Sequence, residues 1–440
     1  MTLKDDADDG IMPYTMHVSA RYLELTRKKL ELTRLPRELE LPDQRKWDYG
    51  TPKAVLEPIV DYWQEYNWRD QETTFNNRLP QFRTTVNVGL SSTSSGDEAR
   101  RKLHFAHTRS SAERAIPLLF CHGWPPSFTE VIKIIDQLSN PISTPPRGSQ
   151  DALGFHVVAP SIPGFGFSDA SSGETFGLRK TAEIFDALMK RLGYEEYVAY
   201  GGDWGFKICR MLALHHQSSC RAIYTNSPDV PPPAPRIAPV AYLKYQVARL
   251  TRGRIPFLRF GYTPSDILAP SRTQRERLSN KPFEDQSFRP QTTAHSLCDS
   301  PVGLLACMLD AIRPSLSLKQ WSNTDILNWT MMHWLPGPEA ALRWLRQASL
   351  EARKDCWKRY SPTPLGISSF GKLAEEPISS PPPWTEGWQR LCWLRRHERA
   401  AKWPAWDAPE ETVIDLRECF GEMIERRLLV FHDTSLVREE

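Results

Sequence analysis

The sequence predicts an α/β protein with a mostly parallel sheet, an inserted helical cap and an N-terminal meander. Three apolar strands that each run into a tight turn support this prediction: IPLLFCHGWPP from Ile116, GFHVVAPSIPGFGFSD from Gly154 and EEYVAYGGDWG from Glu195. Helical stretches such as LRKTAEIFDALMKRLG lie between them. Strands that alternate with helices form parallel sheets with crossover helices on both faces.

The chain before Ile116 has a different pattern. Residues 22–32 and 53–66 carry apolar side chains at helical spacing, and QFRTTVNVGL and RKLHFAHTR have the composition of strands around a Ser/Gly turn. We therefore assign residues 1–112 to the N-terminal meander and residues 113–228 to the first part of the core.

The alternation of strands and helices stops and later resumes. A proline-rich stretch, DVPPPAPRIAP, is followed by helical segments rich in Arg, Leu and Trp, which predicts a cap over residues 229–359. The segments TPLGISSFG, QRLCWLRR and APEETVIDLRECFGEMI then have the pattern of strand, strand and helix. Residues 360–440 are predicted to complete the core.

The composition excludes several classes of function. The net charge of +3 is spread without a basic stripe, so we expect no nucleic-acid partner, and the predicted partners are an apolar small molecule and a second copy in a homodimer. No run of eighteen apolar residues and no signal peptide is present, which predicts a cytoplasmic protein without a membrane span. The eight cysteines form no C-x-x-C pair, so no metal site is expected.

Asp203 is the first candidate catalytic residue. It stands between Gly202 and Trp204 in GGDWG, and Gly205 follows, which gives the small residues that a sharp strand-to-helix turn needs on both sides. A carboxylate on such a turn can attack the carbon of an epoxide and form an ester. The same five residues also occur in ordinary turns between a strand and a helix.

The turn His122-Gly123-Trp124-Pro125 strengthens the catalytic interpretation. It follows a buried strand, and the backbone amides of Trp124 and Trp204 are predicted to form an oxyanion hole for the ester carbonyl. We interpret His122 as a structural hydrogen bonder in the turn rather than as a base.

Several longer motifs carry a family resemblance: WDYGTP, YWQEYNWRDQETTFNNRLPQF, HGWPPSFTE, PSIPGFGFSD, RLGYEEYVAYGGDWG and DSPVGLLA. From about Tyr22 to about Ile424 the chain resembles the epoxide hydrolases with an N-terminal epoxide hydrolase domain, the group of the microsomal and juvenile-hormone enzymes. The resemblance implies an α/β-hydrolase fold, a helical cap over the pocket, and neither a metal nor an organic cofactor. Unlike the microsomal relatives, this sequence shows no N-terminal membrane anchor.

The chain departs from the family pattern where catalysis needs a base. The family histidine in G-G-H-F falls on Lys402, followed by Trp403, and an ammonium group has no lone pair to accept a proton from water. The family's supporting acid falls on Leu373, with Glu375 and Glu376 just beyond it.

The cap departs in a similar way. Two family tyrosines hydrogen-bond the epoxide oxygen; Phe283 replaces the first, and Trp344 or Arg346 falls near the second. Together with Trp403, these residues are our candidates for the pocket.

Three functions compete at this point. The first is a repurposed enzyme of specialised-metabolite biosynthesis, in which Asp203 acts as nucleophile or general acid/base in epoxide opening, cyclisation or isomerisation. The second is an epoxide hydrolase with a relocated base, for which His397 leads over His333 and His432; the alternative for His397 is an exposed residue of RRHERAAK. The third is a non-catalytic binding protein that keeps the turn as a feature of the fold.

Overall fold

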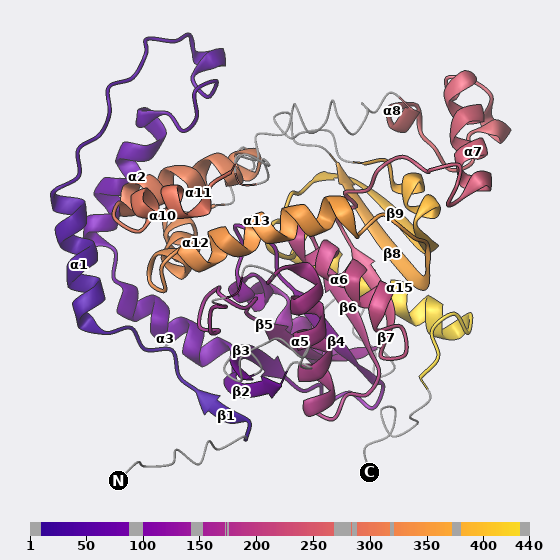
Figure 1. The fold of residues 1–440 in the computed structure, drawn as a ribbon, viewed down its shortest axis with the longest axis horizontal. Helices are drawn as coiled ribbons and strands as arrows, with labels where there is room; N and C mark the ends of the chain where they lie inside the picture. The colour runs from indigo at the N-terminus through magenta and orange to yellow at the C-terminus, as the bar shows by residue number, and fades with distance from the viewer. Residues whose placement is uncertain are drawn as a thin grey trace.

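One mixed sheet organises the molecule (Figure 1). The computed structural model describes residues 10–87, 100–141, 153–171, 173, 176–267, 283, 288–316, 321–371 and 380–431. Within these ranges nine strands lie in the order β1-β2-β3-β5-β4-β6-β7-β8-β9. Their bounds are β1 Met12–Tyr14, β2 Gln81–Asn87, β3 Arg100–Thr108, β4 Ala115–Cys121, β5 Gly154–Pro160, β6 Tyr197–Gly201, β7 Cys220–Thr225, β8 Ser361–Gly371 and β9 Gln389–Ala400.

The pairing confirms the predicted sheet and extends it. All pairs from β5 through β4 to β9 are parallel, whereas β1, β2 and β3 pair antiparallel and β3 joins β5 antiparallel. Every residue of β4 and β5 is buried, as continuous apolar strands of a parallel sheet require. The N-terminal segment therefore widens the core sheet as well as wrapping it.

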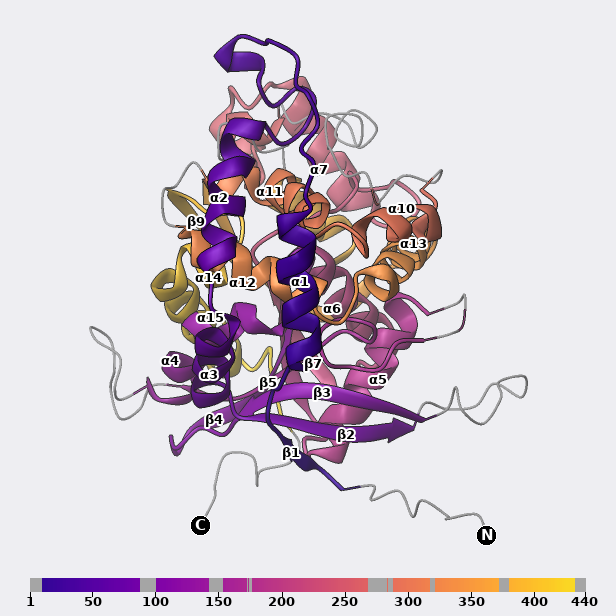
Figure 2. The ribbon, with the colours of Figure 1, turned by 90° about the vertical axis from the view of Figure 1, so that its left-hand side faces the viewer.

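Helices cover both faces of the sheet, as the alternation predicted. Figure 2 shows α5 and α6 on one side and α4 and α15 on the other. Their bounds are α4 Ile135–Ser139, α5 Leu178–Arg191, α6 Asp203–His215 and α15 Pro409–Glu425. The short α14 (Pro404–Asp407) precedes α15, and the 3-10 helix η3 (Phe128–Lys133) precedes α4.

The expected cap region is helical. Between β7 and β8 the described helices are α7 Pro239–Leu250, α8 Pro264–Ile267, α10 Pro290–Leu297, α11 Pro301–Leu316, α12 Asn323–Trp334 and α13 Glu339–Lys354. Figure 1 places α10 to α13 beside the N-terminal helices and α7 at the far end of the molecule. Our boundaries of 229 and 359 stay predictions.

The N-terminal segment contains the two predicted helices, α1 (Ala20–Glu31) and α2 (Lys53–Glu65), and a third, α3 (Trp68–Arg78). The third helix was not predicted because Trp68, Glu72 and Phe75 are its buried residues in an otherwise polar sequence.

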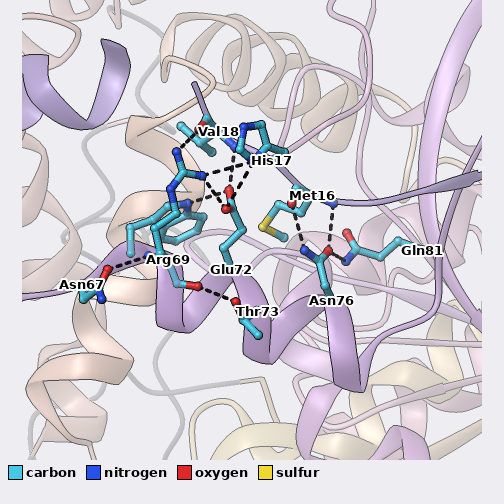
Figure 3. A network of polar contacts seen from close by, with 10 residues as sticks. Met16, His17, Val18, Asn67, Arg69, Glu72, Thr73, Asn76 and Gln81 are labelled. Atoms are coloured by element: carbon cyan, nitrogen blue, oxygen red, sulfur yellow. Dashed lines mark hydrogen bonds and ion pairs between the residues drawn. The ribbon is translucent and has the colours of Figure 1, made fainter. Parts of the chain in front are cut away.

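A polar network fastens the start of the chain to α3 (Figure 3). The buried carboxylate of Glu72 accepts hydrogen bonds from the Val18 amide at 2.6 Å and from Arg69 Nη1 at 2.5 Å. The Asn76 side chain accepts from the Met16 amide at 2.8 Å and donates to the Met16 carbonyl at 2.9 Å. The network aligns the segment that leads from β1 into α1.

Candidate active site

The backbone at Asp203 forms a strained turn between β6 and α6. Asp203 has φ +49°, in the left-handed region that side chains other than glycine rarely adopt. A Cβ atom on Gly205 would lie 1.9 Å from the Cys121 carbonyl oxygen, and one on Gly201 would lie 2.3 Å from the Gly205 carbonyl carbon. Only glycine therefore allows the strand and the helix to approach each other so closely.

The turn after β4 meets the Asp203 side chain. The Trp124 amide donates a hydrogen bond to Asp203 Oδ2 at 3.2 Å. A Cβ atom on Gly123 would stand 3.0 Å from the same oxygen, so glycine leaves room for the carboxylate. Trp204, the second predicted donor, follows Asp203 in the first turn of α6, and the Trp124–Pro125 peptide bond is cis.

His122 has the contacts of a structural residue. Its Nδ1 bonds to the Gly123 carbonyl oxygen at 2.8 Å, and its Nε2 accepts from the Ile162 amide at 3.1 Å. Burial lowers the pKa of the imidazole to about 4. Both ring nitrogens are thus engaged by the backbone of adjoining turns, which agrees with our interpretation of His122.

Lys402 lies in the turn between β9 and α14. The amides of Lys402 and Trp403 both donate to Asp407 Oδ2, at 3.1 and 3.0 Å. The same carboxylate accepts from Ser315 Oγ of α11 and from Trp321 Nε1, each at 3.0 Å. Asp407, which we had not singled out, therefore connects this turn to the cap.

His397 lies inside β9 and contacts α15. Its Nε2 lies 2.6 Å from Asp415 Oδ2, and its ring stacks on Phe370 with centroids 4.4 Å apart. Arg395 Nη1 also pairs with Asp415, at 2.8 Å. The alternative of an exposed His397 was wrong: its side chain is 17% exposed, because β9 continues to Ala400 and turns this side chain against α15.

The candidate pocket residues occupy different places. Phe283 packs edge-on against Trp124, with centroids 5.1 Å apart, and Trp344 packs in the same way on Trp204 at 5.8 Å. The Trp344 indole donates to Thr181 Oγ1 at 2.9 Å.

The other two candidates contact the cap. Arg346 donates to the Phe288 carbonyl. Trp403 packs against Trp329 of α12, with centroids 5.6 Å apart.

Glu130 is a buried carboxyl group that sequence reasoning missed. It belongs to η3, and its side chain is only 6% exposed. Burial and then the negative charges of Asp203 and Asp407 raise its pKa to about 8. The sequence feature that could have indicated a buried carboxyl group is an acidic residue inside the largely apolar run FTEVIKII.

His333 of α12 also approaches the turn after β4. Its Nε2 bonds to the Pro125 carbonyl oxygen at 2.8 Å, and burial lowers the pKa of the ring to about 4. The contact holds a cap helix against the turn that carries Trp124.

Some predicted features lie outside the described residues, namely Leu373, Glu375, Glu376 and His432.

Within the described ranges, no His, Cys, Asp and Glu side chains gather as a metal-binding group. No helix in those ranges has the length and apolar character needed to cross a membrane.

Comparison with known proteins supports the class that the sheet and the turn at Asp203 define. Residues 116–295 match the family model described as alpha/beta hydrolase fold. The crystal structure of juvenile hormone epoxide hydrolase from the silkworm Bombyx mori matches with a TM-score of 0.77 at 22% identity, over 97% of this chain and 97% of that chain. The protein is an α/β-hydrolase-fold enzyme.

The sequence comparisons give the family. Residues 11–131 match the model described as Epoxide hydrolase N terminus. Epoxide hydrolase 1 of Sus scrofa is 29% identical over 442 residues, which cover 94% of this chain and 89% of that protein. Juvenile hormone epoxide hydrolase 1 of Ctenocephalides felis is 29% identical over 309 residues, 69% of this chain and 60% of that protein. The chain is thus similar to epoxide hydrolases over nearly its whole length, as its motifs predicted.

Proposed function

We propose that this enzyme opens the epoxide of an apolar small molecule without net addition of water, in specialised-metabolite biosynthesis. The observation that carries the proposal is a second acid in addition to Asp203: Glu130 is buried, and burial together with the charges of Asp203 and Asp407 raises its pKa to about 8. A carboxyl group that keeps its proton at neutral pH can act as the acid in a reaction in which a second carboxylate acts as the base.

The proton balance of the proposed step is simple. A hydroxyl group of the substrate attacks an epoxide carbon and gives its proton to Asp203, while the C–O bond of the epoxide breaks and its oxygen takes the proton of Glu130. The product is a cyclic ether with the atoms of the substrate. Asp203 ends protonated and Glu130 ionised, and exchange with solvent restores both.

The turn before α14 supports a reaction without hydrolysis. The family resemblance puts Lys402 at the position of the family histidine, and an ammonium group accepts no proton from water. His397, the leading replacement, has its Nε2 engaged with Asp415. Phe283, which packs on Trp124, carries no proton to give, so Glu130 supplies the one that the epoxide oxygen needs.

A second function has one observation in its favour. The Trp124 amide points at Asp203 Oδ2, the arrangement that stabilises the carbonyl oxygen of an ester at Asp203. A hydrolase would form this ester, and ionised Glu130 would then accept a proton from the attacking water. The third alternative, a non-catalytic binding protein, has no such observation.

The test is product analysis in water labelled with heavy oxygen. The protein is incubated with a γ,δ-epoxy alcohol and, in parallel, with styrene oxide, and the intact protein mass is recorded. We expect an unlabelled cyclic ether from the epoxy alcohol. A labelled diol would instead establish hydrolysis, and no turnover and no adduct with either compound would support the binding protein.

Two substitutions assign the groups. We expect Asp203→Asn to lower turnover by about a thousandfold or more, as removal of one member of a cooperating set does. Glu130→Gln should lower it by about a hundredfold, the usual contribution of a general acid.

A cytoplasmic location and a homodimer stay predictions.

A further inference from the structure

The helix α7 turns apolar side chains outward. Val240, Leu243 and Leu250 fall on one face of the helix by their spacing and are 67%, 63% and 82% exposed. Phe257, in the 3-10 helix η5 (Pro256–Leu258) that follows, is 78% exposed. We call these four residues the apolar edge. Apolar faces of surface helices normally point into the core.

The orientation of α7 is set by its other face. Ala241 and Ala248 are buried, and the Tyr245 ring packs against Tyr262 and Trp384, with centroids 5.8 and 5.5 Å apart. The helix thus has its own core contacts, and the apolar edge lies on the side away from them. Figure 1 shows α7 projecting at one end of the molecule.

The segment that forms the apolar edge carries charges of one sign along its sequence. From Val230 to Ser265 the sequence contains no Asp or Glu and six basic residues: Arg236, Lys244, Arg249, Arg252, Arg254 and Arg259. Lys244 pairs with Glu386 at 3.0 Å, and Arg259 Nε donates to the Gly253 carbonyl at 2.6 Å. Arg236, Arg249, Arg252 and Arg254 are exposed.

From this combination we infer that α7 and η5 form a docking surface for a membrane that contains anionic lipids. Apolar side chains of an interfacial helix enter the boundary between headgroups and acyl chains, while arginines on the same element bind lipid phosphates. A second copy of the chain fits this surface poorly, because two such faces would bring their arginine clusters together without acidic partners.

The inference does not depend on the proposed reaction. It places the cap end of the enzyme against a bilayer, the phase in which an apolar substrate dissolves. The contact would be peripheral, since a single amphipathic element lies in the interface and does not span the membrane.

The test is co-sedimentation of the full-length protein with vesicles. We expect binding to phosphatidylcholine vesicles that contain phosphatidylserine, and at least about tenfold weaker binding to phosphatidylcholine alone, because several exposed arginines contribute. Binding to the anionic vesicles should also fall in high salt, since screening shortens the range of the attraction.

Variants separate the contribution of the apolar side chains from that of the arginines. The double change Leu250→Ser and Phe257→Ser should weaken vesicle binding by about tenfold or more. Changing Arg249, Arg252 and Arg254 to Gln should remove the preference for anionic vesicles. Each arginine lost should weaken binding to these vesicles by about fivefold. Leu32→Ser is the matched control, because Leu32 is also 82% exposed but lies beside α1, and it should leave binding unchanged. Thermal unfolding of each variant checks its fold.

Three results would overturn the inference. One is equal binding to charged and uncharged vesicles, or no binding to either. Another is an equal loss of binding in Leu32→Ser. The third is self-association without vesicles that the Leu250 and Phe257 changes abolish, because this would identify a second copy as the occupant.

Discussion

Asp203 and Glu130 illustrate how surroundings give two carboxyl groups different roles. Asp203 is half-buried and receives the Trp124 amide, whereas Glu130 is buried in η3, where the charges of Asp203 and Asp407 act on it. A carboxyl group with a pKa of about 8 still holds its proton at neutral pH. We therefore propose that Glu130 acts as the proton donor in place of the family tyrosines.

The pH dependence of turnover tests this assignment. If Glu130 donates the proton, kcat should fall tenfold per pH unit above about pH 8, because Glu130 must be protonated to act as the acid. Glu130→Gln should remove this alkaline limb. The measurement is kcat against pH for both proteins. A rate that rises towards pH 8 would instead make Glu130 a base and favour hydrolysis.

Glu130 should also make stability depend on pH. Its pKa is raised from 4.5 to about 8 in the folded protein. Below pH 4.5 the group is protonated in both the folded and the unfolded state and has no effect, whereas between pH 4.5 and about 8 the unfolded state ionises more readily, so the free energy of unfolding falls as pH rises. We expect Glu130→Gln to be more stable relative to the native protein at pH 8 than at pH 5. Urea unfolding at the two values measures the difference. An unchanged difference would contradict the burial of this group.

His397 is predicted to stabilise the protein rather than to catalyse. His397→Gln removes one partner of the buried Asp415 carboxylate, so we expect a loss of about 1–3 kcal/mol in the free energy of unfolding. Turnover per folded molecule should change by less than about twofold, since His397 acts on α15 and not on the reacting atoms. Loss of activity with unchanged stability would identify His397 as the relocated base.

At the scale of elements, the turn between β6 and α6 depends on contacts too close for any Cβ. We expect Gly205→Ala to prevent folding or to lower stability by more than about 4 kcal/mol, because the new atom would meet the Cys121 carbonyl oxygen at 1.9 Å. Circular dichroism and soluble yield measure this. Gly421→Ala in α15 is the control: no atom lies within 4 Å of its Cβ position, so it should be neutral or stabilising.

The N-terminal network depends on one buried acid. Glu72→Ala would leave the Val18 amide and Arg69 without their shared acceptor, so we expect a loss of about 1–3 kcal/mol in the free energy of unfolding. Urea unfolding measures it, and Thr73→Ala, an exposed neighbour on α3, should have little effect. Equal effects of the two changes would show that the network contributes nothing specific.

At the scale of the whole molecule, core and cap are joined through Asp407. Its carboxylate accepts from two cap groups, Ser315 Oγ and Trp321 Nε1, and from two amides of the turn before α14. Burial raises the pKa of Asp407, and its hydrogen bonds oppose that rise. The position of the cap over the site is thus coupled to the turn that carries Lys402.

Asp407→Ala should loosen the cap. We expect a loss of about 3 kcal/mol or more, because four donors lose their acceptor, and faster proteolysis between α11 and α13. Limited proteolysis followed by mass spectrometry measures the sites of cleavage. Glu410→Ala, at an exposed position of α15, is the control. Cleavage confined to the N-terminal segment would contradict this role of Asp407.

The sequence by itself determined the parallel core, the helical cap and the turn at Asp203. These features depend on consecutive residues: apolar runs of strand length, helical spacing, and the glycines around Asp203. Local sequence also indicated the turn at His122 and Trp124, since both follow directly from a buried strand.

Only the tertiary structure decided which side chains meet across the site. The contact of His397 with Asp415, the link from Asp407 to the cap and the proximity of Glu130 to Asp203 join residues from separate elements. The Arg346 and Trp344 side chains likewise bind neighbours that spacing along the chain does not reveal. Such contacts depend on how helices pack on the sheet, and many different packings are compatible with the same local pattern.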